Sequence, residues 1–191
     1  MLDRVARIAT VVLTVAYPLL VWAGLSRGNV RATAVTLVGV GGALLLLRAR
    51  GRGWRDVGAL ARPLLPTLVA AAATGLTGDP ALLLWAPVVV NLGLLAGFGA
   101  TLRPGRVPMI ERFARLQHPE LSARARRWCR GVTTLWLGFF AANAVASAVL
   151  AAAAPLSWWA AYCGGGVYGL IGLLLVGERV LRPRHDGGDD A

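Results

Sequence analysis

Charged residues are scarce in this sequence, and their scarcity argues against an ordinary soluble domain. Only 15% of the 191 residues are charged, whereas 57% are hydrophobic. A soluble domain of this size has about a quarter of its residues charged and roughly 45–50% apolar. The mean hydropathy is +0.62. This composition predicts an integral membrane protein.

Lysine is absent, so all twenty basic residues are arginine, and only nine acidic residues oppose them. A net charge of +11 on one soluble domain would indicate nucleic-acid binding. Here the arginines lie between apolar segments, where the preference of basic residues for the cytoplasmic side explains them. We therefore expect contact with membrane lipids and not with nucleic acid.

Cysteines, possible metal ligands and catalytic motifs are also few. Cys129 and Cys163 cannot frame a disulfide scaffold, and we expect the first at the cytoplasmic surface and the second inside a span. The set His118, Glu111, Glu120 and Cys129 matches no zinc-ligand spacing. Neither Gly-x-Ser-x-Gly nor His-Glu-x-x-His occurs. The sequence therefore predicts no catalytic residue, no metal and no cofactor.

Six apolar segments approach the roughly 20 residues that a helix needs to cross a bilayer. They predict an all-α, polytopic membrane helical bundle that forms one domain over residues 1–184, with a disordered acidic tail over 185–191. The expected spans are 8–25, 32–47, 58–76, 81–102, 132–154 and 158–176. The third is the weakest, because it contains Pro66 and needs Arg62 inside the helix. A re-entrant segment is its alternative.

The arginines indicate the orientation of these spans. With six spans and a cytoplasmic N-terminus, eighteen of the twenty arginines lie on the inner side, and only Arg27 and Arg31 lie outside. Basic residues concentrate on the cytoplasmic side of membrane proteins. The sequence therefore predicts that both termini are cytoplasmic.

The longest interruption, residues 103–131, is a basic cytoplasmic loop with eight arginines. Its segment Pro108–Leu116 reads as a short amphipathic helix. A second helix should start at Pro119, with Glu120 in its first turn, and continue into the fifth span. The loop suggests a docking face for anionic lipid or for an acidic partner such as an acyl carrier protein. The candidate docking residues are Arg112, Arg115, Arg124, Arg126, Arg127 and Arg130. The alternative is that the arginines only set the topology.

Polar residues in or beside the apolar segments are the other candidate positions. Asn91 and Asn143 could line a substrate path or bond to another helix. Glu178 could join that path, or form an interfacial ion pair with Arg179 or Arg182. The run of three glycines from Gly164 predicts close helix packing or a kink.

The second half of the chain contains "PMIERFARLQHPELSARARRWCRGVTTLWLGFFAANAVASAVLA", then "WWAAY" and "GLIGLLLVGERVLR". These segments resemble a family of uncharacterised bacterial inner-membrane proteins. The family is typically encoded near fatty-acid-like synthesis genes, including aryl-polyene (xanthomonadin-type) pigment clusters. Where that family tends to have Tyr-Asn-Gly, this chain has Tyr162-Cys163-Gly164. The matching positions are Glu111, Arg112, Pro119, Glu120, Leu121, Arg130, Trp136, Phe139, Phe140, Asn143, Tyr162, Gly177 and Glu178.

The resemblance implies a place in the bacterial inner membrane beside lipid or polyene assembly, and no particular reaction. Together with the basic loop it predicts a non-catalytic accessory or scaffold protein for acyl-lipid or aryl-polyene biosynthesis. The alternative is a small transporter or flippase for a lipid-linked product. A membrane enzyme ranks third, because the sequence offers no nucleophile and base for one.

Overall fold

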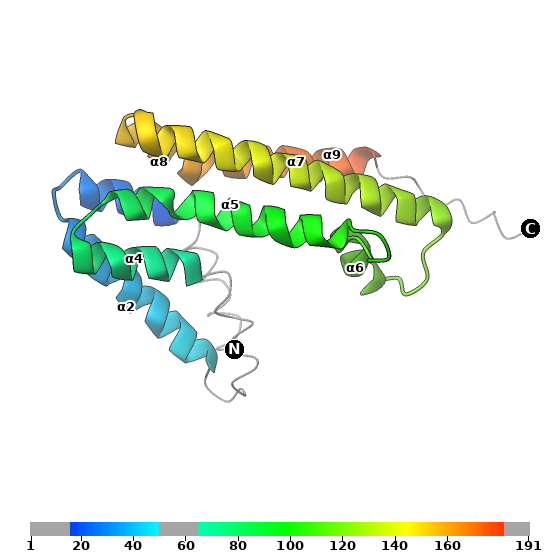
Figure 1. Cartoon of the computed structure of the whole chain (residues 1–191), viewed down its shortest axis with the longest axis horizontal. Coiled ribbons are helices and arrows are strands. Elements are labelled where there is room, and N and C mark those ends of the chain that lie inside the picture. The colour runs from blue at the N-terminus through cyan, green and yellow to red at the C-terminus, as the bar shows by residue number, and fades with distance from the viewer. Residues whose placement is uncertain (1–15, 50–64, 182–191) are drawn as a thin grey trace, which may run out of the picture. The chain divides into compact units, whose positions relative to one another are not determined.

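A computed structural model describes residues 16–49 and 65–181, and these residues are 84% helical with no strand among them (Figure 1). The all-α prediction is confirmed for this part of the chain. The elements in order are a helix over Ala16–Leu25, α2 (Val30–Ala49), α4 (Leu65–Thr77), α5 (Ala81–Thr101), α6 (Met109–Arg115), α7 (Ala123–Ala153), α8 (Leu156–Ala161), the single π-helical turn η1 (Tyr162–Gly166) and α9 (Val167–Leu181).

Within the described residues, three helical segments are long and apolar enough to cross a membrane: α5, α7 and the continuous run Leu156–Leu181. The helix Ala16–Leu25, the apolar part of α2 and α4 are shorter. The first and third predicted spans include residues 8–15 and 58–64, which lie outside the described residues, as does the predicted tail 185–191. The structure thus supports a helical membrane protein, and the six-span count stays a prediction.

The membrane-length helices carry apolar side chains on their outer faces as well as on their packed ones. Only 22% of the apolar window of α5, and the same share of that of α7, is buried. Val89 and Leu92 of α5 are exposed, as are Val145 and Val149 of α7. On a helix that faces water, apolar residues are confined to one buried stripe. Apolar residues on all sides fit a helix in hydrocarbon.

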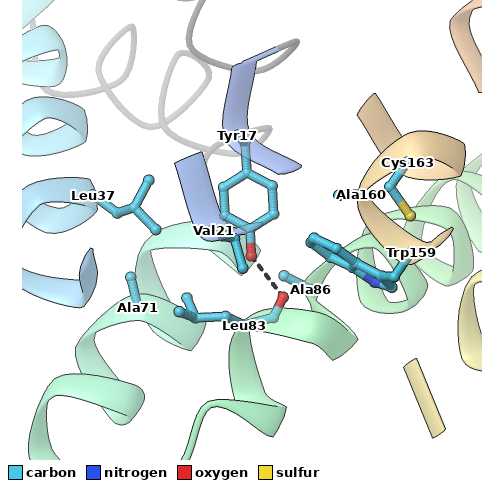
Figure 2. Close-up of a cluster of buried hydrophobic side chains, with 9 residues drawn as sticks. All are labelled: Tyr17, Val21, Leu37, Ala71, Leu83, Ala86, Trp159, Ala160 and Cys163. Carbon is cyan, nitrogen blue, oxygen red and sulfur yellow. Dashed lines mark hydrogen bonds between the residues drawn. The ribbon is translucent and has the colours of Figure 1, made fainter. Parts of the chain in front are cut away.

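The chain divides into two compact units, of which the first contains Met1–Val90 and Asn143–Tyr168. The core of this unit collects side chains from five helical segments and η1 (Figure 2). They are Tyr17, Val21, Leu37, Ala71, Leu83, Ala86, Trp159, Ala160 and Cys163. In the same unit α2 packs on α4, and a Cβ added at Gly41 would lie 2.5 Å from Cδ2 of Leu68. The absence of a side chain at Gly41 therefore leaves room for Leu68 of α4.

A proline inside α5 explains a polar feature of this core. Pro87 has no N–H, so the carbonyl of Leu83, four residues earlier, loses its helical donor. The hydroxyl of Tyr17 donates to that carbonyl at 2.6 Å (Figure 2), and Nε1 of Trp159 donates to the next carbonyl, that of Leu84, at 3.1 Å. Two aromatic side chains from distant segments thus supply donors where the proline interrupts the helix.

The turn between α4 and α5 has residues that suit a tight turn. Gly78 has a φ of 78°, a left-handed conformation that glycine adopts without steric cost. Oδ1 of Asp79 accepts a hydrogen bond from the N–H of Ala81 at 2.9 Å, which satisfies a free donor at the start of α5. Residue type and backbone conformation agree, so this turn follows from local sequence.

The second unit contains Asn91–Ala142 and Gly169–Ala191, and it holds α6 against α5 and α7. The N–H of Met109 donates to Oγ1 of Thr101 at 3.0 Å, and the N–H of Ile110 donates to Oγ1 of Thr133 at 3.2 Å. These bonds satisfy free donors at the start of α6. The predicted short helix is therefore present over Met109–Arg115, and it is anchored by its N-terminal end, but its buried residue is Glu111 while the apolar Phe113 is exposed.

The prediction that a helix starts at Pro119 is wrong. Pro119 and Glu120 lie in the connecting loop, and α7 begins at Ala123. The hydroxyl of Ser122 accepts from the N–H of Ala125 at 3.2 Å, the usual arrangement of a serine N-cap. This cap sets the start of the helix downstream of the proline. The predicted continuation into the fifth span is confirmed, because α7 is unbroken to Ala153.

Candidate functional site

A groove between the N-terminal part of α7 and the C-terminal part of α9 is the candidate site, and it is called the α7–α9 groove below. It encloses about 590 Å³, within the roughly 300–1,000 Å³ typical of ligand pockets. Its lining is Arg124, Arg127, Trp128, Gly131, Val132, Leu135, Leu173, Leu174, Gly177, Glu178 and Leu181. All of these residues belong to the second unit. Three of them, Arg124, Arg127 and Glu178, are candidate docking or polar positions from the sequence.

Helical spacing explains why these residues share a groove. On α7 the lining positions follow Arg124 at intervals of three, four, seven, eight and eleven residues, which places them on one face. On α9 the positions that follow Leu174 lie at three, four and seven residues. Gly131 and Gly177 stand where the two walls would otherwise carry side chains, and a Cβ added at either meets nothing within 4 Å. The glycines therefore help to leave the groove open.

The α7 wall is positively charged at its N-terminal end. Arg124 and Arg127 are exposed, and within the described residues neither guanidinium has a hydrogen bond or an ion pair. The first turn of α7 contains no acidic residue. The positive end of the helix dipole adds to the arginine charge there, which costs helix stability and favours an anion. This end of the groove suits a phosphate or a carboxylate.

The α9 wall carries one negative charge. Glu178 is partly exposed, and its carboxylate forms no ion pair with Arg179 or with another residue of the described ranges. Arg182, the other partner suggested by the sequence, lies outside those ranges. Two positive charges and one negative charge therefore border the apolar groove, and none of them forms an ion pair with a described residue.

The remaining candidate arginines are exposed, and three of them are engaged within the second unit. Nε of Arg112 donates to the carbonyl of Val107 at 3.0 Å, and a terminal nitrogen of Arg130 donates to the carbonyl of Leu102 at 2.9 Å. Arg115 forms an ion pair at 2.6 Å with Glu111, which is buried. Arg126 has no such partner among the described residues.

This arrangement splits the predicted docking set into two groups. Arg112, Arg115 and Arg130 have their guanidinium groups bonded within the second unit. Arg124, Arg126 and Arg127 are available to other molecules. Glu111, a candidate polar position, holds Arg115 on its own helix, since the two residues are one turn apart.

The loop residues do not form a site together in the described structure. His118 and Glu120 are exposed between α6 and α7. Cys129 was expected at the surface, but it is 4% exposed, because the face of α7 that carries it is the packed one. Among the described residues no group of three His, Cys, Asp or Glu residues could hold a metal ion.

The candidate asparagines of α5 and α7 are both buried. Oδ1 of Asn143 accepts a hydrogen bond from the hydroxyl of Tyr162 at 2.8 Å, which ties α7 to η1. Asn91 is buried in α5. The bond of Asn143 is of the kind that joins membrane helices. The glycine run also matches its packing prediction, because a Cβ on Gly164 would make van der Waals contact with Leu19 at 3.5 Å.

Comparisons of the chain with protein families, with curated proteins and with solved structures gave no match.

Proposed function

We propose that this chain is a non-catalytic accessory protein of the bacterial inner membrane, which docks anionic lipid headgroups through its basic segment Arg103–Arg130. The observation that carries the proposal is that all eight arginines of this segment are exposed. Five of them have no guanidinium partner among the described residues: Arg103, Arg106, Arg124, Arg126 and Arg127. In acyl-lipid or aryl-polyene biosynthesis, such a protein would gather lipid products or enzymes at the membrane.

The charges are sufficient for this role. A basic residue near an anionic leaflet contributes about 1 kcal/mol of attraction. Five unengaged arginines would contribute roughly 5 kcal/mol before screening by salt, which acts beyond about 8 Å at physiological ionic strength. The planar guanidinium also makes paired hydrogen bonds to phosphate oxygens. A phosphate-bearing leaflet therefore fits this segment better than a diffuse acidic surface does.

The proposal places the basic segment on the cytoplasmic side of six spans, with both termini inside. Reporter fusions test that placement directly. We expect alkaline phosphatase to be inactive when fused after Gln117 and active when fused after Asp79. An active Gln117 fusion would put the arginines on the wrong side of the membrane and end the docking proposal.

Lipid enrichment tests the docking itself, with arginines chosen outside the α7–α9 groove. The protein is extracted in native nanodiscs, and its lipids are quantified by mass spectrometry. We expect the variant R103Q/R106Q/R126Q to lose most of the enrichment in phosphatidylglycerol that the unmodified protein shows. The matched control is R27Q/R31Q, which removes exposed charge from a different turn. Equal enrichment in all three samples contradicts the proposal.

The alternative is that the same arginines bind an acidic protein, and a separate experiment tests it. If R103Q/R106Q/R126Q releases a bound acyl carrier protein in a pull-down while lipid enrichment is unchanged, the partner is protein. The transporter alternative needs Asn91, Asn143 and Glu178 to face a path. The bond from Tyr162 to Asn143 argues instead for a structural role of that asparagine.

A further inference from the structure

We propose that the α7–α9 groove holds one aminophospholipid molecule. Its phosphate lies between Arg124 and Arg127, its ammonium group meets Glu178, and an acyl chain lies along the apolar walls. This inference rests on the proposed function in one respect, because it needs the start of α7 to lie at headgroup level. It goes further by naming one site, one lipid class and one selecting residue.

The charges select the headgroup. The two arginines on one wall and the carboxylate on the other have no partners among the described residues. An anionic lipid such as phosphatidylglycerol would satisfy the arginines and leave Glu178 unpaired beside hydrocarbon, where an unpaired charge is costly. A headgroup with a phosphate and a primary ammonium satisfies both walls.

The apolar part of the groove favours a ligand with an acyl chain. Beyond the arginines, the α7 wall continues through Val132 to Leu135, and the rise of 1.5 Å per residue makes this wall roughly 16 Å long. The facing wall adds Leu173 and Leu174, and Leu173 is exposed. A water-soluble phosphate compound would leave this surface empty. A lipid covers it with an acyl chain while its headgroup stays at the charged end.

Trimethylation of the ammonium gives a matched ligand control. Phosphatidylcholine has the same phosphate and the same formal charges as phosphatidylethanolamine, but its nitrogen carries no N–H donor. A primary ammonium can donate a charge-assisted hydrogen bond to a carboxylate at about 2.7–2.9 Å, and a quaternary one cannot. Selectivity between these two lipids therefore reports on Glu178 and not on the arginines.

The test is native mass spectrometry of the full-length protein. The protein is titrated with phosphatidylethanolamine, phosphatidylcholine and phosphatidylglycerol of identical acyl composition. For the unmodified protein we expect the first phosphatidylethanolamine to bind about tenfold more tightly than phosphatidylcholine, the size of a charged hydrogen bond. E178Q should remove most of this preference, because it abolishes the charged hydrogen bond to phosphatidylethanolamine, whereas phosphatidylcholine loses only the attraction between charges. R124Q/R127Q should weaken the binding of all three lipids. R27Q/R31Q removes exposed charge from a different turn, outside the groove and outside the basic segment, and should change none of them.

Two results would overturn the inference. One is equal binding of phosphatidylethanolamine and phosphatidylcholine to the unmodified protein, a comparison that needs no variant to fold. The other is tightest binding of phosphatidylglycerol with no effect of E178Q. Either result leaves the anionic docking proposal standing if R103Q/R106Q/R126Q still loses its lipid enrichment. Conversely, suppose that R103Q/R106Q/R126Q keeps the full phosphatidylglycerol enrichment while the unmodified protein still prefers phosphatidylethanolamine to phosphatidylcholine. That result would reject the docking proposal and leave the groove proposal standing.

Discussion

Replacing Tyr17 with phenylalanine should destabilise the protein by removing the donor that serves the carbonyl of Leu83. The hydroxyl is buried and lies 2.6 Å from that oxygen, and Pro87 offers no N–H in its place. Hydrogen bonds between membrane helices are worth about 0.6 kcal/mol on average. A buried acceptor left unsatisfied costs about 1–3 kcal/mol. We therefore expect the free energy of unfolding to fall by about 1–2 kcal/mol, between the value of an average bond and the cost of an unsatisfied acceptor.

The assay is thermal unfolding in detergent, followed by circular dichroism, on a four-member double-mutant cycle. A loss of about 1–2 kcal/mol lowers the midpoint by roughly 2–8 °C for a chain of this size. In the P87A background, the introduced alanine supplies the missing N–H, so Y17F should cost at least about 1 kcal/mol less there. The edge-on contact of the ring with Trp159, at 6.5 Å between centroids, survives in both phenylalanine variants. An equal cost of Y17F in both backgrounds would refute the proposed link to Pro87.

Two further predictions compare matched residues. Trp159→Phe removes the bond from Nε1 to the carbonyl of Leu84 and should cost about 1 kcal/mol more than Trp128→Phe, whose buried Nε1 has no partner among the described residues. The same thermal unfolding assay checks this order, and a reversed order contradicts it. Gly24→Ala would drive a Cβ into the side chain of Thr33 and should cost about 1–3 kcal/mol. Gly39→Ala meets nothing within 4 Å and should stabilise α2 by up to about 1 kcal/mol.

Local signals predicted the elements well. The fourth span was expected over 81–102 and α5 covers Ala81–Thr101. The short helix expected over Pro108–Leu116 covers Met109–Arg115. Helix bounds depend on apolar runs and on prolines at helix starts, which involve only residues close together in the chain. They can therefore be predicted from the sequence. The start of α7 was missed because Pro119 and Ser122 compete as start signals three residues apart. The serine hydroxyl decides by capping a backbone donor.

The contacts between distant segments were not predictable in the same way. Tyr17 and Pro87 were each placed within a predicted span, but nothing in the sequence joins two residues that lie in different helices. The groove likewise depends on the pairing of α7 with α9, which helical spacing alone does not give. Spacing does show that Arg124, Arg127 and Leu135 share a face of α7. It does not show what lies opposite.

The unbroken run of α7 sets a mechanical relation between its charges and the bilayer. At 1.5 Å per residue its 31 residues measure about 46 Å, whereas the hydrocarbon layer is about 30 Å thick. The arginine-bearing turns before Gly131 account for about 12 Å of this excess of roughly 16 Å. These guanidinium groups therefore share one continuous helix with the apolar residues of α7. When the surrounding bilayer thins or thickens, the height of the basic group above the phosphates must shift, or the helix must tilt.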